Sequence, residues 1–164
     1  MSAADAGIDT RAEAVPLPGV ATPSGVPAGF RLFPLPGGFV GVNGPFLLRH
    51  EGHEVRLGFR VEARHCNVAG ICHGGMLATF ADMLLPIGAI LQVPAVQKRF
   101  LPTVSLQIDY LAPAKLGAWV EGEMQVLRTT RTMVFAQGLV TSDGEPALRC
   151  SGVFKIGPEI DRGF

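Results

Sequence analysis

The chain has 164 residues, enough for one domain with a substantial hydrophobic core. Its 14 basic and 14 acidic residues balance, so charge gives no indication of a nucleic-acid-binding surface. The three cysteines form no disulfide framework, which favours a reducing, cytoplasmic setting. The acidic N-terminus does not resemble a signal peptide, and the longest apolar run, from Met83 to Leu91, is too short to span a bilayer. We therefore expect a cytoplasmic protein that binds neither nucleic acid nor membrane.

The first 29 residues are rich in alanine, proline and glycine and have no sustained periodicity. This composition predicts a flexible tail over 1–29, with the folded domain over 30–164. Residues 30–46 mix prolines and glycines with apolar residues, which predicts an ordered, turn-rich lead-in and leaves short strands there open. Residues 54–63 alternate between apolar and charged side chains, the pattern of a half-buried strand.

A helix is predicted from about Gly74 to about Gln92. Large apolar residues recur there at helical spacing, and the segment is apolar nearly all round, so the helix should be buried. Pro86 lies inside it and cannot donate a hydrogen bond to the carbonyl of Asp82. We expect a bend or an early helix end near this acid, or simply a shorter helix.

Four more segments are predicted as strands, at 103–110, 118–128, 133–142 and 147–156. Each is rich in β-formers and roughly alternating, with turn residues between the segments. Asp143 and Gly144 separate the last two, which is a good hairpin signal. One apolar helix covered by an antiparallel sheet is an α+β arrangement.

The candidate site is the stretch from His65 to Ile90, where a polar loop leads into the apolar helix. A carbonyl under attack develops negative charge on its oxygen, which free N–H groups at a helix N-terminus can receive. Gly74 and Gly75 lie at that N-terminus and leave room for a carbonyl. Asp82 is the only acid between Glu62 and Asp109, so it is the candidate base or nucleophile.

The spacing of these groups constrains the site. Eight residues separate Gly74 from Asp82, roughly 12 Å along a helix at about 1.5 Å per residue. One carbonyl cannot contact both groups of the same chain. If both act, two helices must lie antiparallel about a two-fold axis, so the chemistry requires a homodimer with two equal sites.

Each of these residues also has a plainer interpretation. Gly74 and Gly75 could form only a tight turn, and Asp82 could be a buried acid paired with an arginine. His73 could cap the helix, and Asn67 could be only a turn former.

A metal site is another use of this loop. Zinc could be bound by His65, Cys66, Cys72 and His73, but their spacing does not match the common ligand pairs. Catalysis by Cys72 with His73 is disfavoured because adjacent side chains point apart. We therefore expect no metal.

With these residues in view, the sequence resembles the hotdog-fold acyl-CoA thioesterases, in particular the PaaI-like group of the 4-hydroxybenzoyl-CoA thioesterase superfamily. The resemblance covers residues 44–156. Its main motif has Asn67, Gly70, His73, Gly74 and Gly75, followed by Asp82. The supporting motifs lie at 43–45 and 103–114.

The resemblance implies a long central helix wrapped by a curved antiparallel sheet, with two sheets joined edge to edge in a dimer and dimers often paired into tetramers. It implies hydrolysis of an acyl-CoA thioester, with Asp82 activating water or attacking directly and the Gly74 N–H polarising the carbonyl. Asn67 and His73 would shape that half of the site. Thr103 would lie near the acid of its own subunit and help to hold the water. CoA would be part of the substrate, so no cofactor is implied.

Candidate contacts to the substrate follow from its chemistry. The phosphates of CoA need cations, and the loop-borne candidates are Lys98, Arg99, Lys115, Arg128 and Arg131, although any one could be a solvated surface charge. Gly75, Phe80 and Met83 are candidates for the apolar, acyl-binding side, which would suit aryl, short or medium chains alike. A non-catalytic acyl-CoA-binding or regulatory protein of the same fold is the alternative function. A hydratase is weaker, because the sequence lacks the expected Asp/His pair.

Overall fold

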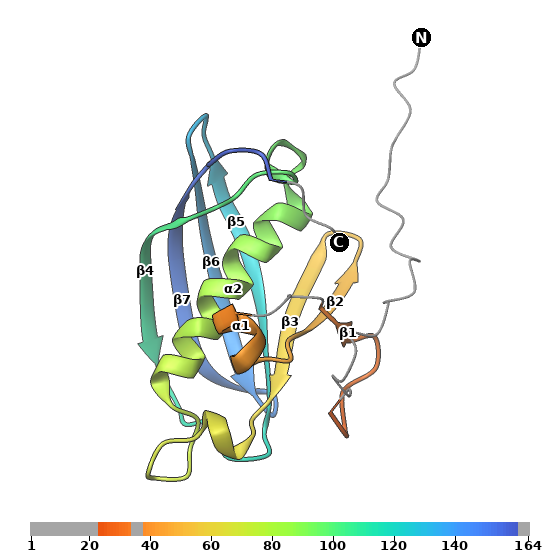
Figure 1. The fold of residues 1–164 in the computed structure, drawn as a ribbon, viewed down its shortest axis with the longest axis vertical. Coiled ribbons are helices and arrows are strands. Elements are labelled where there is room, and N and C mark those ends of the chain that lie inside the picture. The colour runs from red at the N-terminus through yellow and green to blue at the C-terminus, as the bar shows by residue number, and fades with distance from the viewer. Residues whose placement is uncertain (1–22, 34–37, 161–164) are drawn as a thin grey trace.

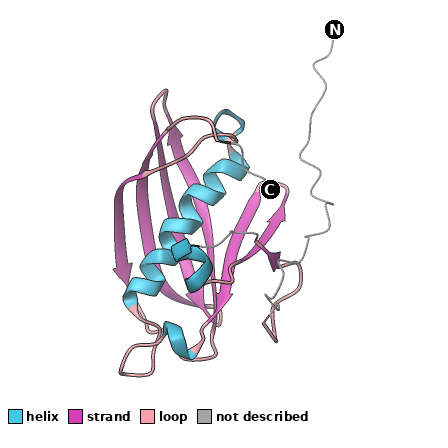
Figure 2. Ribbon diagram, in the orientation of Figure 1, coloured by secondary structure: helices cyan, strands magenta, loops and turns pink. Residues whose placement is uncertain are grey.

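The computed structural model describes residues 23–33 and 38–160 (Figures 1 and 2). It contains one long helix, α2, which lies across a curved sheet (Figure 1). The elements in chain order are β1 (Arg31–Leu32), α1 (Gly38–Asn43), β2 (Leu47–Glu51), β3 (Glu54–Arg60), η1 (Ala63–His65), α2 (Gly74–Gln92), η2 (Pro94–Val96), β4 (Thr103–Tyr110), β5 (Trp119–Thr129), β6 (Met133–Ser142) and β7 (Glu145–Lys155).

The sheet has seven strands in the order β1-β2-β3-β5-β6-β7-β4, and every neighbouring pair is antiparallel. The hairpin between β6 and β7 turns at Asp143 and Gly144, with φ angles of 49° and 88°. Two positive φ angles in succession suit the twist of a tight hairpin, as the Asp-Gly pair predicts. Strand β4 forms one edge of the sheet, and no described strand pairs with its outer side.

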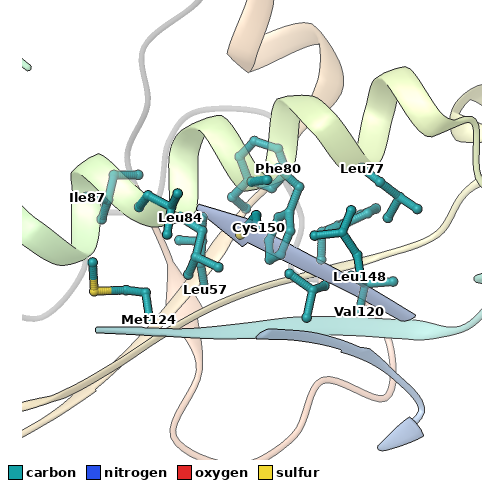
Figure 3. Close-up of a cluster of buried hydrophobic side chains, with 14 of the residues drawn as sticks. Leu57, Leu77, Phe80, Leu84, Ile87, Val120, Met124, Leu148 and Cys150 are labelled. Atoms are coloured by element: carbon teal, nitrogen blue, oxygen red, sulfur yellow. The ribbon is translucent and has the colours of Figure 1, made fainter. Parts of the chain in front are cut away.

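The main core lies between α2 and the sheet (Figure 3). Phe80 and Leu84 are fully buried there, and the rings of Phe46 and Phe59 pack against Phe80 at centroid distances of 5.8 and 5.1 Å. At Gly88 a Cβ atom would lie 2.4 Å from the Met124 side chain, so only glycine allows strand β5 to approach the helix this closely. The helix is therefore fixed along its length by one tightly packed face.

The predicted α+β architecture and the predicted helix are confirmed, with α2 running from Gly74 to Gln92. The expectations of an early helix end near Asp82 and of a helix shortened by Pro86 are wrong, because α2 continues to Gln92 with Pro86 inside it. The five predicted strands correspond to β3, β4, β5, β6 and β7, within a few residues at each end. Helix α1 and strand β2 were not predicted.

The chain contacts the sheet before the domain start predicted at residue 30. The Arg60 guanidinium donates a hydrogen bond to the Gly25 carbonyl, and Val26 packs against the small cluster of Phe30, Leu47 and Trp119. The rest of the predicted tail, residues 1–22, lies outside the described residues.

By length and apolar composition alone, α2 could cross a membrane. More than half of its most apolar window is buried inside the protein (56%), as expected for the core helix of an α+β domain.

Candidate active site

The loop before α2 is held by its own hydrogen bonds. The Asn67 side-chain oxygen accepts a hydrogen bond from the Ala69 N–H at 2.9 Å, and the Asn67 N–H donates to the Ile71 carbonyl at 2.9 Å. His73 is the N-cap residue of α2, and its Nδ1 accepts a hydrogen bond from the Gly75 N–H at 2.9 Å. Asn67 therefore shapes the turn and His73 caps the helix, so both residues fix where the first helical amides point.

Gly74 is the first residue of α2, and its N–H donates no hydrogen bond to any described residue. The cap at His73 satisfies the neighbouring amide and leaves this one open. An unpaired N–H at the positive end of a helix dipole is suited to receive a carbonyl oxygen.

Tyr110 lies against the same residue and was missed as a site residue in the sequence. Its hydroxyl donates a hydrogen bond to the Gly74 carbonyl at 2.8 Å, and a Cβ atom at Gly74 would lie 3.4 Å from the Tyr110 hydroxyl oxygen. Tyr110 ends strand β4 and is 54% exposed. It therefore ties the end of the edge strand to the start of α2, a contact between distant residues that no local pattern reveals.

Asp82 lies on α2 and is half-buried. Its Oδ1 accepts a hydrogen bond from the Thr103 hydroxyl at 2.6 Å, so Thr103, the first residue of β4, lies beside the acid of its own chain. The plainer interpretation of Asp82, a pair with an arginine, is not found among the described residues: no described Lys or Arg nitrogen lies within 4.0 Å of its carboxylate. A half-buried carboxylate with one hydroxyl partner keeps lone pairs available for a substrate or a water molecule.

Phe80 is predicted to contact the substrate. In the described chain its side chain is fully buried between α2 and the sheet, where it packs against Phe46 and Phe59. Helical spacing identified Phe80 as apolar but could not tell a core position from a pocket position. Met83 is half-buried at the edge of the same core, and Gly75 is exposed at the start of the helix.

Four of the five candidate cations gather beyond the C-terminal end of α2. Lys98 and Arg99 follow η2, whereas Arg128 and Arg131 lie on or beside the hairpin that joins β5 to β6. Residues 155–157 connect the two segments through hydrogen bonds to the carbonyls of Pro102, Thr132 and Phe100. Arg99 pairs with Glu159 at 3.8 Å.

Lys115 does not belong to this group. Its backbone forms an isolated antiparallel β-bridge with Ile71, in the loop before α2.

The residues that were weighed as zinc ligands, His65, Cys66, Cys72 and His73, do not form a metal cluster. Within residues 23–33 and 38–160, no group of three or more His, Cys, Asp or Glu side chains is arranged to hold a metal ion. His65 is 4% exposed, its Nδ1 accepts a hydrogen bond from the Glu62 N–H at 3.0 Å, and its ring packs edge-on against Phe59. His65 is therefore part of the core packing of the loop.

One hollow of the described chain lies apart from these residues. It has a volume of about 890 Å³ and is lined largely by polar side chains of the strands, among them Gln107, Asp109, Gln125, Gln137 and Arg149. Neither Asp82 nor Gly74 lines it. This hollow is therefore separate from the candidate catalytic groups.

The long helix lying on a curved antiparallel sheet is the hotdog fold. The family model of the thioesterase superfamily matches residues 69–147. A Pseudomonas aeruginosa protein whose name assigns it to the esterases is 30% identical over 80% of this chain and 97% of its own length. The chain belongs to the thioesterase superfamily and is a thioester hydrolase, as the resemblance predicted.

Other relatives agree with this assignment. Human acyl-coenzyme A thioesterase 13 is 30% identical over 57% of this chain and 64% of its own length. The solved structure of zebrafish thioesterase superfamily member 2 is 27% identical, with a TM-score of 0.65 over 73% of this chain and 87% of that chain.

Proposed function

We propose that the protein hydrolyses acyl-CoA thioesters to a free acid and CoA at sites shared between two copies of the chain. The single observation that carries the proposal is the environment of Asp82. This half-buried carboxylate accepts one hydrogen bond, from Thr103 at 2.6 Å, and no described cation neutralises it. Its remaining lone pairs are therefore available for a reacting water molecule or carbonyl.

The need for two copies follows from the length of the helix. Gly74 and Asp82 are eight residues apart on α2, roughly 12 Å at about 1.5 Å per residue, so they cannot act on one carbonyl within a chain. Two α2 helices related by a two-fold axis bring Gly74 of one copy to Asp82 of the other. The unpaired outer edge of β4, with Val104 59% exposed, supports joining of the two sheets at this strand. A dimer of such dimers is part of the same proposal.

The chemistry divides between the two ends of the shared site. The Gly74 N–H receives the negative charge that develops on the thioester oxygen. The Asp82 carboxylate of the other copy promotes attack on the carbonyl carbon, by activating water or by attacking itself, and the Thr103 hydroxyl orients it. His73 and Asn67 hold the loop that positions the Gly74 amide.

The CoA end of the substrate is assigned to the cations beyond the C-terminus of α2. Asp82 is ten residues from Gln92, roughly 15 Å at about 1.5 Å per residue, which the long pantetheine arm of CoA can span. Lys98, Arg99, Arg128 and Arg131 would then meet the phosphates. The acyl group, aryl or short to medium alkyl, would lie near Met83 and Gly75, and the setting would be the cytoplasm.

The test is release of CoA, detected with a thiol reagent, from a panel of aryl and alkyl acyl-CoAs. Asp82→Asn should lower turnover about a hundredfold or more, because the amide cannot act as base or nucleophile. Asp143→Asn is the matched control: it makes the same change at a hairpin turn that tolerates Asn, and turnover should stay at the wild-type level. Wild-type turnover in Asp82→Asn would reject the proposal.

A further inference from the structure

Two of the three cysteines face each other across the loop that leads into α2. Cys66 and Cys72 form an isolated antiparallel bridge. The hydrogen bonds of this bridge join the flanking residues, from the Asn67 N–H to the Ile71 carbonyl at 2.9 Å and from the His73 N–H to the His65 carbonyl at 2.8 Å. The two cysteines are thus a non-hydrogen-bonded pair, for which the Cα atoms are typically about 4.5 Å apart.

The two thiols lie on the same side of the loop. Directly opposed residues of an antiparallel pair share a face. Cys72 belongs to the main core, and Cys66 packs against the same core from a half-buried position. Burial raises the pKa of Cys72 to about 12, and the nearby Cys66 thiol adds to this rise. Disulfides span Cα separations of roughly 4.4 to 6.8 Å, and the typical separation of a non-hydrogen-bonded pair falls within this range.

We propose that Cys66 and Cys72 form a reversible disulfide that acts as a redox switch for the loop before α2, with a small-molecule disulfide as the oxidant. The half-buried Cys66, as thiolate, attacks one sulfur of the oxidant, forms a mixed disulfide and releases one thiol. Cys72 then loses its proton and attacks the Cys66 sulfur, which releases the second thiol. In total two protein thiols are oxidised and one oxidant disulfide is reduced to two thiols.

The environment of Cys72 makes the switch slow in both directions. Its high pKa leaves little thiolate for the closing step. In the reverse reaction, attack on the Cys66 sulfur must expel this same high-pKa thiolate, and attack on the Cys72 sulfur must reach a buried atom. Once formed, the bond should persist until a strong reductant is supplied.

The consequence for turnover rests on the proposed function. Cys72 directly precedes the cap residue His73 and the amide of Gly74. A separation of about 4.5 Å is at the short end of the disulfide range, whose most common value is about 5.5 to 6 Å, so closing the bond pushes the two sides of the loop apart by up to about 1 Å. Because a displacement of that size can cost about a hundredfold in rate, we expect the oxidised protein to turn over at least about tenfold more slowly.

The first measurement counts thiols in the full chain without any substrate. The protein is titrated with oxidised glutathione, quenched with acid, denatured and alkylated, and its peptides are mapped by mass spectrometry. We expect the free thiols to fall from three to one, with Cys66 linked to Cys72 and Cys150 alkylated. Cys150→Ala should form the same bond, whereas Cys66→Ser should form none. Persistent glutathione on wild-type Cys66, or no reaction at either cysteine, would overturn the proposal.

The second measurement compares turnover before and after oxidation. Wild type should lose activity in step with the disulfide and recover it with dithiothreitol, whereas Cys66→Ser should be insensitive to oxidised glutathione. A disulfide that forms and leaves turnover unchanged would reject the switch. Absence of turnover in the reduced protein would instead reject the proposed function, and the thiol count would still decide whether the bond forms.

Discussion

The two faces of α2 differ in how completely their groups find partners within the chain: side chains are tightly packed on one face, and polar groups have few hydrogen-bond partners on the other. On the face toward the sheet, Phe80 and Leu84 are fully buried, and Gly88 allows contact with Met124. Away from this packed face lie Asp82, with its one hydroxyl partner, and the first amide of the helix, with none. The packed face holds the helix rigidly and leaves these polar groups half-buried at fixed positions. Stability and chemistry are thus carried by different sides of one element.

The largest effect on stability should come from the packed face. Phe80→Ala removes a ring in contact with Phe46 and Phe59, so we expect a loss of about 3–5 kcal/mol in the free energy of unfolding. The adjacent Thr79→Ala is the control, because the Thr79 hydroxyl bonds only the Gly75 carbonyl of its own helix, and its cost should be about 0.5 kcal/mol. Urea denaturation measures both. Equal losses in the free energy of unfolding for the two variants would contradict the claim that the packed face carries the stability.

The next largest effect should be on turnover, through the open amide. Gly74→Pro deletes the N–H at a position where proline suits a helix, and His73 already has the extended ψ of 136° that a residue before proline requires. We expect turnover to fall about a hundredfold with little change in stability. Gly74→Ala keeps the N–H and is the matched control. Full activity in Gly74→Pro would remove this amide from the mechanism.

The smallest effect should be on the pH dependence of stability, through His65 in the loop before α2. Burial is the main cause that lowers the pKa of His65 below its ordinary value of 6.5, and the Arg64 guanidinium adds to it. Below about pH 6.5 the unfolded chain therefore binds a proton that the folded chain does not, so the free energy of unfolding falls as the pH drops. His65→Gln should lose this part of the pH dependence in urea titrations, whereas the exposed His53→Gln should keep it. Identical pH profiles of the free energy of unfolding for wild type and His65→Gln would show that His65 does not cause this pH dependence.

The helix and the later strands could be predicted because burial imposes a period on the sequence. Residues 74–92 are apolar at helical spacing, and the segments of β4 to β7 alternate, so α2 and β4 were predicted with their observed bounds. Helix α1 has six residues, three of them glycine or asparagine, and buries no side chain, so it has no such pattern. The unpredicted β2 has only one buried residue, Leu47.

The site was less predictable than the fold, since it depends on contacts between distant residues. Asp82 stood out because an isolated acid on an apolar helix is unusual. The Thr103 contact could be expected only from the family resemblance, and the Tyr110 contact with Gly74 was not expected at all. The burial of Phe80 in the core could not be predicted, because periodicity does not show which side of a helix faces the sheet.

The central claim is that each site takes its amide from one copy and its acid from the other. The most direct test mixes Asp82→Asn with Gly74→Pro subunits, with different tags to verify mixed dimers. Each mixed dimer should have one intact site, so random assortment should restore about a quarter of wild-type turnover. Turnover no higher than that of the two variants alone, in a preparation that contains mixed dimers, would contradict the claim.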